Sequence, residues 1–142
     1  PVGYFRDIST YGGCVAGCTA AVENIRIIEN ENLVENSAQM GQYLLAGLNE
    51  FKTHPLVGDV RGKGLFAGVE LVADKATKEP CKESVLAGIV GDVKSQGVII
   101  GRMGRSLPNQ NNVLTMAPAL IATKADIDRI VGAIGNALAK LK

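Results

Sequence analysis

A pair of hydroxyl side chains precedes two glycines near the start of the sequence. Ser9 and Thr10, then Gly12 and Gly13, lie just before a segment with helical periodicity. The first turn of a helix carries free N–H groups and partial positive charge, so hydroxyl groups placed there can help to bind a phosphate. Ser9 or Thr10 can instead simply cap the helix, which is the commoner use of such residues. The spacing alone favours the cap.

Two arginines, Arg102 and Arg105, lie in a Gly- and Asn-rich segment between two strand-like stretches. A guanidinium can bind a carboxylate or sulfonate through two parallel hydrogen bonds, so either arginine can recognise an acidic substrate. Both can also be ordinary solvated loop arginines, and the residues alone leave the two interpretations open. Arg61 lies beside Gly62 and Gly64 between apolar stretches, where a structural role is preferred.

The residue content excludes several catalytic classes. The single histidine, His54, rules out a Ser/His/Asp or Cys/His nucleophile set. The glycines form neither a P-loop nor a dinucleotide-binding pattern. Three cysteines at irregular spacing are a poor disulfide framework, which favours a cytosolic compartment. A metal site is not expected, because Cys14 and Cys18 lack further ligands, and we predict that both are buried as small apolar side chains.

Composition is that of a soluble globular protein of about one domain, with 142 residues, 46% hydrophobic and 20% charged. The net charge of +1 gives no reason to expect nucleic acid or an anionic membrane as a partner. Apolar runs such as 117–122 are far shorter than the ~20 residues that a membrane span needs. The sequence begins at Pro1 without a basic-then-apolar leader, so no secretory signal is expected. Because it starts without Met, we expect it to be a piece of a longer chain.

Apolar residues recur at helical spacing in four segments: 12–28, 32–51, 85–97 and 123–141. The first helix is rich in small residues and should therefore pack closely against a partner. Capping boxes are predicted at the start of the second and last helices, formed by Asn32 with Glu35 and by Thr123 with Asp126.

Strands are predicted at 57–61, 65–72, 98–100 and 113–116, with a glycine turn at 62–64. In the second strand the odd-numbered side chains should be buried, because apolar residues alternate there with a period of two. Short strands with interspersed helices indicate an α+β fold, with a small, mostly antiparallel sheet and helices packed on one face.

Three stretches, in a consistent order along the chain, carry a resemblance to a known family. They are 7–13 (DISTYGG), 57–71 (VGDVRGKGLFAGVEL) and 117–121 (APALI), the last followed by the predicted helix from Thr123. Together they resemble the C-terminal part of a class III aminotransferase, the group that includes omega-amino-acid–pyruvate, taurine–pyruvate and ornithine aminotransferases. The segment 105–112 is most similar to the taurine– or beta-alanine–pyruvate branch.

The resemblance implies fold type I of the pyridoxal-phosphate enzymes, in which a large cofactor domain precedes a small C-terminal domain. Residues 1–30 would then be the end of the large domain and the connecting helix, and residues 31–142 the small domain. The resemblance also implies pyridoxal 5'-phosphate as cofactor, a homodimer, and transfer of an amino group from an omega-amino acid or amine to a keto acid, with pyruvate expected.

Residue roles follow from the same resemblance. In the family, the threonine matching Thr10 binds the cofactor phosphate across the dimer interface, which reverses the preference for a cap. An arginine after a small-domain strand binds the substrate carboxylate; Arg102 matches by its place and Arg105 by its neighbours, so both are expected candidates. The catalytic lysine lies upstream of Pro1 in the family pattern. No lysine of this chain is therefore given a catalytic role, and the chain by itself is expected to be inactive.

Two points stay open beside the resemblance. Many relatives carry His-Pro or Asn-Pro where this sequence has Cys14-Val15, which leaves the local loop geometry undecided. The alternative function is a free-standing α+β ligand-binding or regulatory module. Such a module would need a complete apolar surface of its own, and the small-residue helix around 16–21 argues against one.

Overall fold

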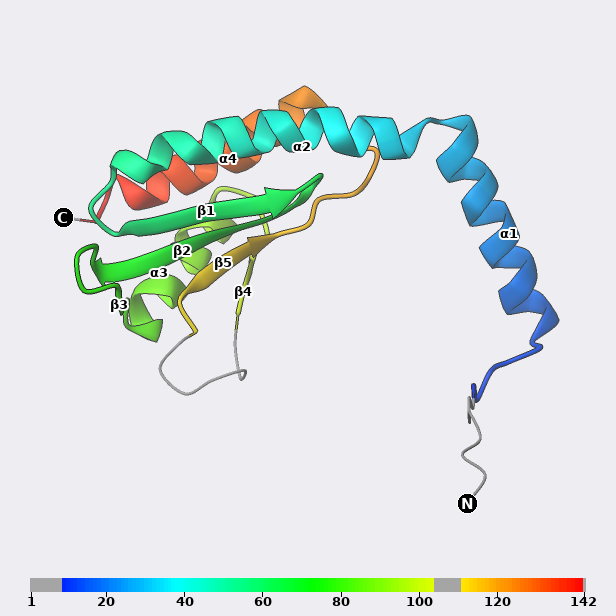
Figure 1. The fold of residues 1–142 in the computed structure, drawn as a ribbon, viewed down its shortest axis with the longest axis horizontal. Coiled ribbons are helices and arrows are strands. Elements are labelled where there is room, and N and C mark those ends of the chain that lie inside the picture. Colours follow the sequence, from blue (N-terminus) through cyan, green and yellow to red (C-terminus); the bar gives the residue numbers. More distant parts are fainter. Residues whose placement is uncertain (1–8, 104–110, 142) are drawn as a thin grey trace, which may run out of the picture. The chain divides into compact units, whose positions relative to one another are not determined.

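The computed structural model describes residues 9–103 and 111–141, which are drawn in colour in Figure 1. The chain divides into two compact units, Pro1–Val34 and Glu35–Lys142. The assignment of residues 1–30 to a large cofactor domain stays a prediction, and each unit is described by itself.

The first unit contains the helix α1 (Val15–Asn30), which starts three residues later than predicted. Its N-cap is Cys14, which makes no side-chain cap hydrogen bond. Ile28 is half-buried and the other residues of α1 are exposed. Cys14 and Cys18 are among the exposed residues, so the prediction that both are buried is wrong for this chain. The prediction that the small residues of α1 pack closely against another segment is not tested by this structure.

The second unit is an α+β fold, as predicted. Its sheet has the order β1-β2-β5-β4, with β3 paired to β2, and every pairing is antiparallel. Along the chain its elements are α2 (Leu33–Glu50), whose first residues belong to the first unit, η1 (Phe51–Thr53), β1 (Val57–Lys63), β2 (Phe66–Asp74), β3 (Glu79–Pro80), α3 (Glu83–Ser95), β4 (Gly101–Arg102), β5 (Val113–Met116) and α4 (Lys124–Leu138).

One face of the sheet is covered by helices and holds the core (Figure 1). The odd-numbered residues from 65 to 71 are all buried, which confirms the alternation predicted for β2. They share one apolar cluster with Leu44 of α2, Leu86 of α3 and Ile134 of α4, all fully buried. Burying a side chain of this size contributes about 1.5–3 kcal/mol, so this cluster holds the three helices to the sheet.

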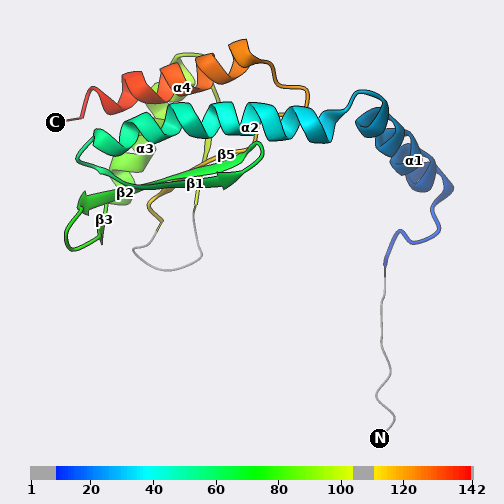
Figure 2. The same cartoon turned by 45° about the horizontal axis from the view of Figure 1, so that its top comes forward.

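Helices α2 and α4 lie side by side and run in the same direction (Figure 2). The Tyr43 hydroxyl donates a 2.6 Å hydrogen bond to Asp128. One turn further along both helices, a Cβ added at Gly47 would come 3.1 Å from Val131. The absence of a side chain at Gly47 therefore allows the two helices to approach closely.

The turn between β1 and β2 lies later than predicted. Residues 62 and 63 continue β1, and the chain turns at Gly64 and Leu65. Gly64 has a φ of +53°, a conformation that glycine adopts without the cost that a Cβ would bring. The predicted turn at 62–64 is corrected accordingly.

The predicted strand at 98–100 is also wrong, because the pairing begins one residue later, in β4. Gly101 lies opposite Thr115 in the β4–β5 ladder. That register leaves residues 98–100 facing the end of β5, which stops at Met116, so they have little strand to pair with. The polar connection predicted at 74–80 contains the two-residue strand β3, which pairs with β2.

The two predicted capping boxes have opposite outcomes. Asn32 has a φ of +51°, which is not the extended conformation of an N-cap, and Glu35 accepts a 2.8 Å hydrogen bond from Gln39 instead. The prediction at Asn32 is therefore wrong. At α4 the box is confirmed: the Thr123 hydroxyl accepts from the Asp126 N–H, and the Asp126 carboxylate accepts from the Thr123 N–H.

Thr123→Ala should lower the free energy of unfolding by about 1 kcal/mol at neutral pH, the usual cost of losing an N-cap. The hydrogen bonds from Thr123 lower the pKa of Asp126 below its usual value. These hydrogen bonds therefore stabilise the fold fully at pH values above the pKa of Asp126 in the unfolded chain. Their stabilisation is lost as the pH falls through the lower pKa of Asp126 in the folded chain. Urea denaturation at neutral and acidic pH checks this, and the difference between parent and variant should shrink in acid. Thr123→Ser, which keeps the hydroxyl, should match the parent at both pH values.

Candidate functional site

The segment before α1 presents Thr10 without using it as a cap. The Gly12 N–H donates to the Ser9 carbonyl and the Cys14 N–H to the Tyr11 carbonyl, both at 3.1 Å, so this segment forms a tight turn. Because the N-cap is Cys14, the alternative in which Ser9 or Thr10 caps the helix is not what the structure shows. Thr10 is exposed, and its hydroxyl has no hydrogen-bond partner among residues 9–103 and 111–141.

Within residues 9–103 and 111–141, no side chain accepts a hydrogen bond from the N–H groups at the start of α1. Cys14 makes no cap hydrogen bond, and the first turn of the helix contains no acidic residue. Free N–H groups at a helix N-terminus, with a hydroxyl nearby and no competing carboxylate on the helix, suit an anion such as a phosphate. The segment therefore fits the cofactor phosphate that the sequence resemblance implies.

Of the two predicted arginines, the structure places Arg102 in β4; Arg105 lies outside the described residues. Arg102 pairs with Leu114 of β5 in the sheet, and the next N–H, of Met103, donates a 2.8 Å hydrogen bond to the Val113 carbonyl. The Arg102 side chain is 39% exposed. Its backbone is thus held by the sheet while its guanidinium can reach a solute.

A carboxylate that no sequence pattern singles out, that of Glu83, lies beside Arg102. One oxygen of Glu83, Oε2, lies 3.6 Å from Arg102 Nη1. The other, Oε1, accepts a 2.7 Å hydrogen bond from the Asn111 amide. Glu83 belongs to the first turn of α3 and Asn111 precedes β5, so three separate segments meet at this carboxylate.

Asn112, next to this group, ties β5 to β2. It is only 6% exposed, and its side-chain amide donates a 2.7 Å hydrogen bond to the Leu71 carbonyl. The Leu71 N–H donates back to the Asn112 carbonyl at 2.8 Å. A buried amide satisfied in this way fixes the start of β5 against β2.

Arg61 has the structural role preferred from the sequence. Its guanidinium donates to Glu70 at 2.6 Å and to Asp59 at 3.1 Å, which lie on β2 and β1. The hydrogen bond to Glu70, followed by that to Asp59, raises the pKa of Arg61 above its usual value. Both bonds use the same nitrogen, Nη1, and tie the guanidinium to the two strands, which is a structural role.

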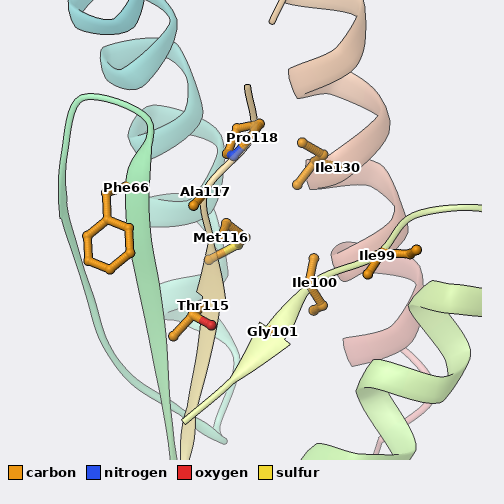
Figure 3. Close-up of a pocket in the computed structure, with 9 residues that line it drawn as sticks. All are labelled: Phe66, Ile99, Ile100, Gly101, Thr115, Met116, Ala117, Pro118 and Ile130. Carbon is orange, nitrogen blue, oxygen red and sulfur yellow. The ribbon is translucent and has the colours of Figure 1, made fainter. Parts of the chain in front are cut away.

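A cavity of about 370 Å³ lies where β2 begins and β5 ends (Figure 3). Phe66 of β2 borders it on one side, with Ile130 of α4 and Ile100 on the other. The one polar side chain in its lining is that of Thr115, and none of its side chains can titrate. The cavity therefore has the character of a packing surface rather than of a reaction centre.

Comparison with known proteins gives a match over nearly the whole chain. The profile of the family Aminotransferase class-III matches residues 6–138. The hypotaurine/taurine–pyruvate aminotransferase of Paracoccus denitrificans (strain Pd 1222) is 57% identical over 139 residues, which cover 97% of this chain and 30% of that enzyme. The chain therefore spans under a third of the length of this relative.

Solved structures agree with this match. The crystal structure of a Bacillus anthracis aminotransferase superposes with a TM-score of 0.91 at 48% identity, covering 97% of this chain and 31% of that one. The omega transaminase from Pseudomonas jessenii in complex with PMP has a TM-score of 0.75 at 38% identity, covering 84% and 25%. Within residues 9–103 and 111–141, no helix is long and apolar enough to cross a membrane.

Proposed function

Because this chain belongs to the class III aminotransferase family, we propose that it is the C-terminal part of an enzyme that transfers an amino group from taurine, hypotaurine or a similar omega-amino acid to pyruvate. The observation that carries this proposal is the 57% identity, over 97% of the chain, with a hypotaurine/taurine–pyruvate aminotransferase. The enzyme is further proposed to be a cytosolic homodimer whose catalytic lysine lies in the preceding part of its chain.

The proposed cofactor is pyridoxal 5'-phosphate, which the family uses and whose aminated form, PMP, is named in the Pseudomonas jessenii complex. When bound, it stabilises the negative charge that develops on the substrate carbon during amino transfer. In this chain, Thr10 and the N–H groups at the start of α1 would hold the phosphate. The exposed hydroxyl and the uncapped helix end support this role.

Thr10→Ala in the full-length enzyme should weaken cofactor binding about tenfold, because one hydrogen bond to a charged group, about 1.5 kcal/mol, is lost. Titration of the apoenzyme with pyridoxal 5'-phosphate, followed by absorbance, gives the dissociation constant. Thr19→Ala is the matched control, because Thr19 lies on α1, which follows Thr10, and its hydroxyl donates to the Val15 carbonyl. Equal dissociation constants for Thr10→Ala and the parent would remove Thr10 from the phosphate site.

The residue proposed to bind the acid group of the substrate is Arg102 or Arg105. Pyruvate carries a carboxylate and taurine a sulfonate, and a guanidinium binds either group through paired hydrogen bonds. The partly exposed guanidinium of Arg102, on a backbone held by the sheet, supports Arg102 for this role. Arg105 stays an alternative, because the residues around it resemble those around the substrate-binding arginine of the family.

The function is tested by expressing the full-length enzyme and supplying taurine and pyruvate. The expected result is the formation of alanine in step with the loss of taurine, dependent on added pyridoxal 5'-phosphate. Hypotaurine and beta-alanine as donors then define the donor range. If alanine forms from none of these donors, the proposed substrate class is wrong.

A further inference from the structure

We propose that Glu83 is a positioning residue for Arg102: it holds the guanidinium while no substrate acid is bound and is displaced when one binds. The inference rests on the proposed function, in which Arg102 binds the substrate acid. The observation behind it is that Glu83 contacts both ends of the connection between β4 and β5. Its Oε2 lies 3.6 Å from Arg102 Nη1, and its Oε1 accepts a 2.7 Å hydrogen bond from Asn111.

Glu83 is held in place from two sides. It lies in the first turn of the 13-residue helix α3, where the helix dipole stabilises a negative charge. The Asn111 amide then engages one of its two oxygens. Turning this amide over would bring two oxygens together, so the orientation of Asn111 depends on a carboxylate at position 83. The other amide atom, Asn111 Oδ1, is buried and has no partner among the described residues.

Arg102, in contrast, is held loosely. A distance of 3.6 Å is longer than the ~2.7–3.2 Å of an N–H···O hydrogen bond. The side chains of Arg102 and Glu83 are 39% and 52% exposed, and ion pairs at that exposure are weak. A guanidinium has five N–H donors, of which those on one nitrogen face Glu83. A substrate acid that forms two parallel hydrogen bonds therefore displaces this contact.

Glu83 consequently has two opposing effects on the site. Its carboxylate restricts the guanidinium of Arg102 to one side of β4, which limits the conformations of that side chain when no acid is bound. Its negative charge also competes with the incoming acid for the same guanidinium. Replacing the charge while keeping the shape separates these effects, and glutamine does so because its amide oxygen can still accept the hydrogen bond from Asn111.

The test is Glu83→Gln in the full-length enzyme. The Michaelis constant for pyruvate should fall by roughly twofold to fivefold, the size expected for losing a partly exposed ionic competitor. The dissociation constant of propionate, an acid that cannot react, should fall by the same factor in a calorimetric titration. The kcat value and the Michaelis constant for an amine without an acid group should stay at the parental values. A Glu83 that only supports the fold would instead leave all of these constants unchanged or worsen them for both substrates, and either result overturns the proposal.

Two further variants separate this inference from the proposed function. Glu79→Gln removes the same charge from β3, where the Glu79 side chain has no ion pair within the described part of the chain, and it should leave the constant for pyruvate unchanged. In an Arg102→Ala background, Glu83→Gln should lose its effect. If Arg102→Ala itself leaves pyruvate binding intact, the assignment of Arg102 fails and this proposal fails with it. If Arg102→Ala weakens binding while Glu83→Gln does not strengthen it, only the role of Glu83 is wrong.

Discussion

Arg102→Ala in the full-length enzyme is expected to raise the Michaelis constant for pyruvate tenfold to a hundredfold and to leave that for an amine without an acid group near the parental value. The reason is the loss of a charge-assisted contact of ~1.5–3 kcal/mol that only the acid-bearing substrate makes. The fold should be unaffected, because β4 is held by the main-chain pairing of Arg102 with Leu114 and by the hydrogen bond from Met103 to Val113.

Steady-state titrations with each substrate, on Arg102→Ala and separately on Arg105→Ala, decide between the two arginines. Arg26→Ala serves as the control, because Arg26 is an exposed arginine of α1 whose partner is Glu23. A large increase for pyruvate in one variant alone identifies the residue. If both variants bind pyruvate as the parent does, or lose both substrates equally, neither arginine recognises the acid.

The elements that the sequence predicted correctly depend on local signals. The strand β5 and the alternation of β2 follow from side chains that must face one core, and the capping box of α4 involves residues three apart. Such patterns need only one buried face or one helix end. A local signal is not sufficient, however, because the same spacing at Asn32 and Glu35 does not form a capping box.

The elements that were mispredicted depend on a partner far along the chain. β4 is two residues long, and its place is decided by the register that puts Gly101 opposite Thr115, where a Cβ would come 2.5 Å from the Thr115 hydroxyl. No local periodicity reports that contact. The same holds for β3, whose two residues pair with the end of β2.

The site divides in the same way. Thr10 and Arg102 were singled out from residue type, position and family resemblance. Glu83 was not singled out. Its hydrogen bond with Asn111 joins residues 28 apart, and its contact with Arg102 depends on how α3 packs beside β4. An acidic residue in the first turn of a helix is ordinary, so nothing in the sequence distinguishes Glu83 before the chain is folded.

The contact between α2 and the β1–β2 turn leaves no room for a side chain at Gly41, so a substitution there should lower stability. Gly41 of α2 is buried against Gly64, and a Cβ at position 41 would come 2.3 Å from the Gly64 carbonyl carbon and oxygen. The turn cannot easily move away, because the Leu65 N–H donates to the Ser37 hydroxyl on the same helix and Gly64 has its own positive φ. Backbone therefore lies directly on backbone, with no flexible side chain to give way.

Gly41→Ala should consequently lower the free energy of unfolding by about 3 kcal/mol, the upper part of the usual cost of overpacking. The direction is informative, because alanine normally stabilises a helix by about 1 kcal/mol relative to glycine. Gly88→Ala supplies the matched control: Gly88 lies inside α3 with nothing within 4 Å of an added Cβ, so this variant should be more stable than the parent. Urea denaturation of the two variants and the parent gives both values. A Gly41→Ala variant as stable as Gly88→Ala would mean that α2 does not contact the β1–β2 turn. Leu44 and Leu48 continue the same face of α2 into the core. The packing of α2 on the sheet would therefore also be wrong.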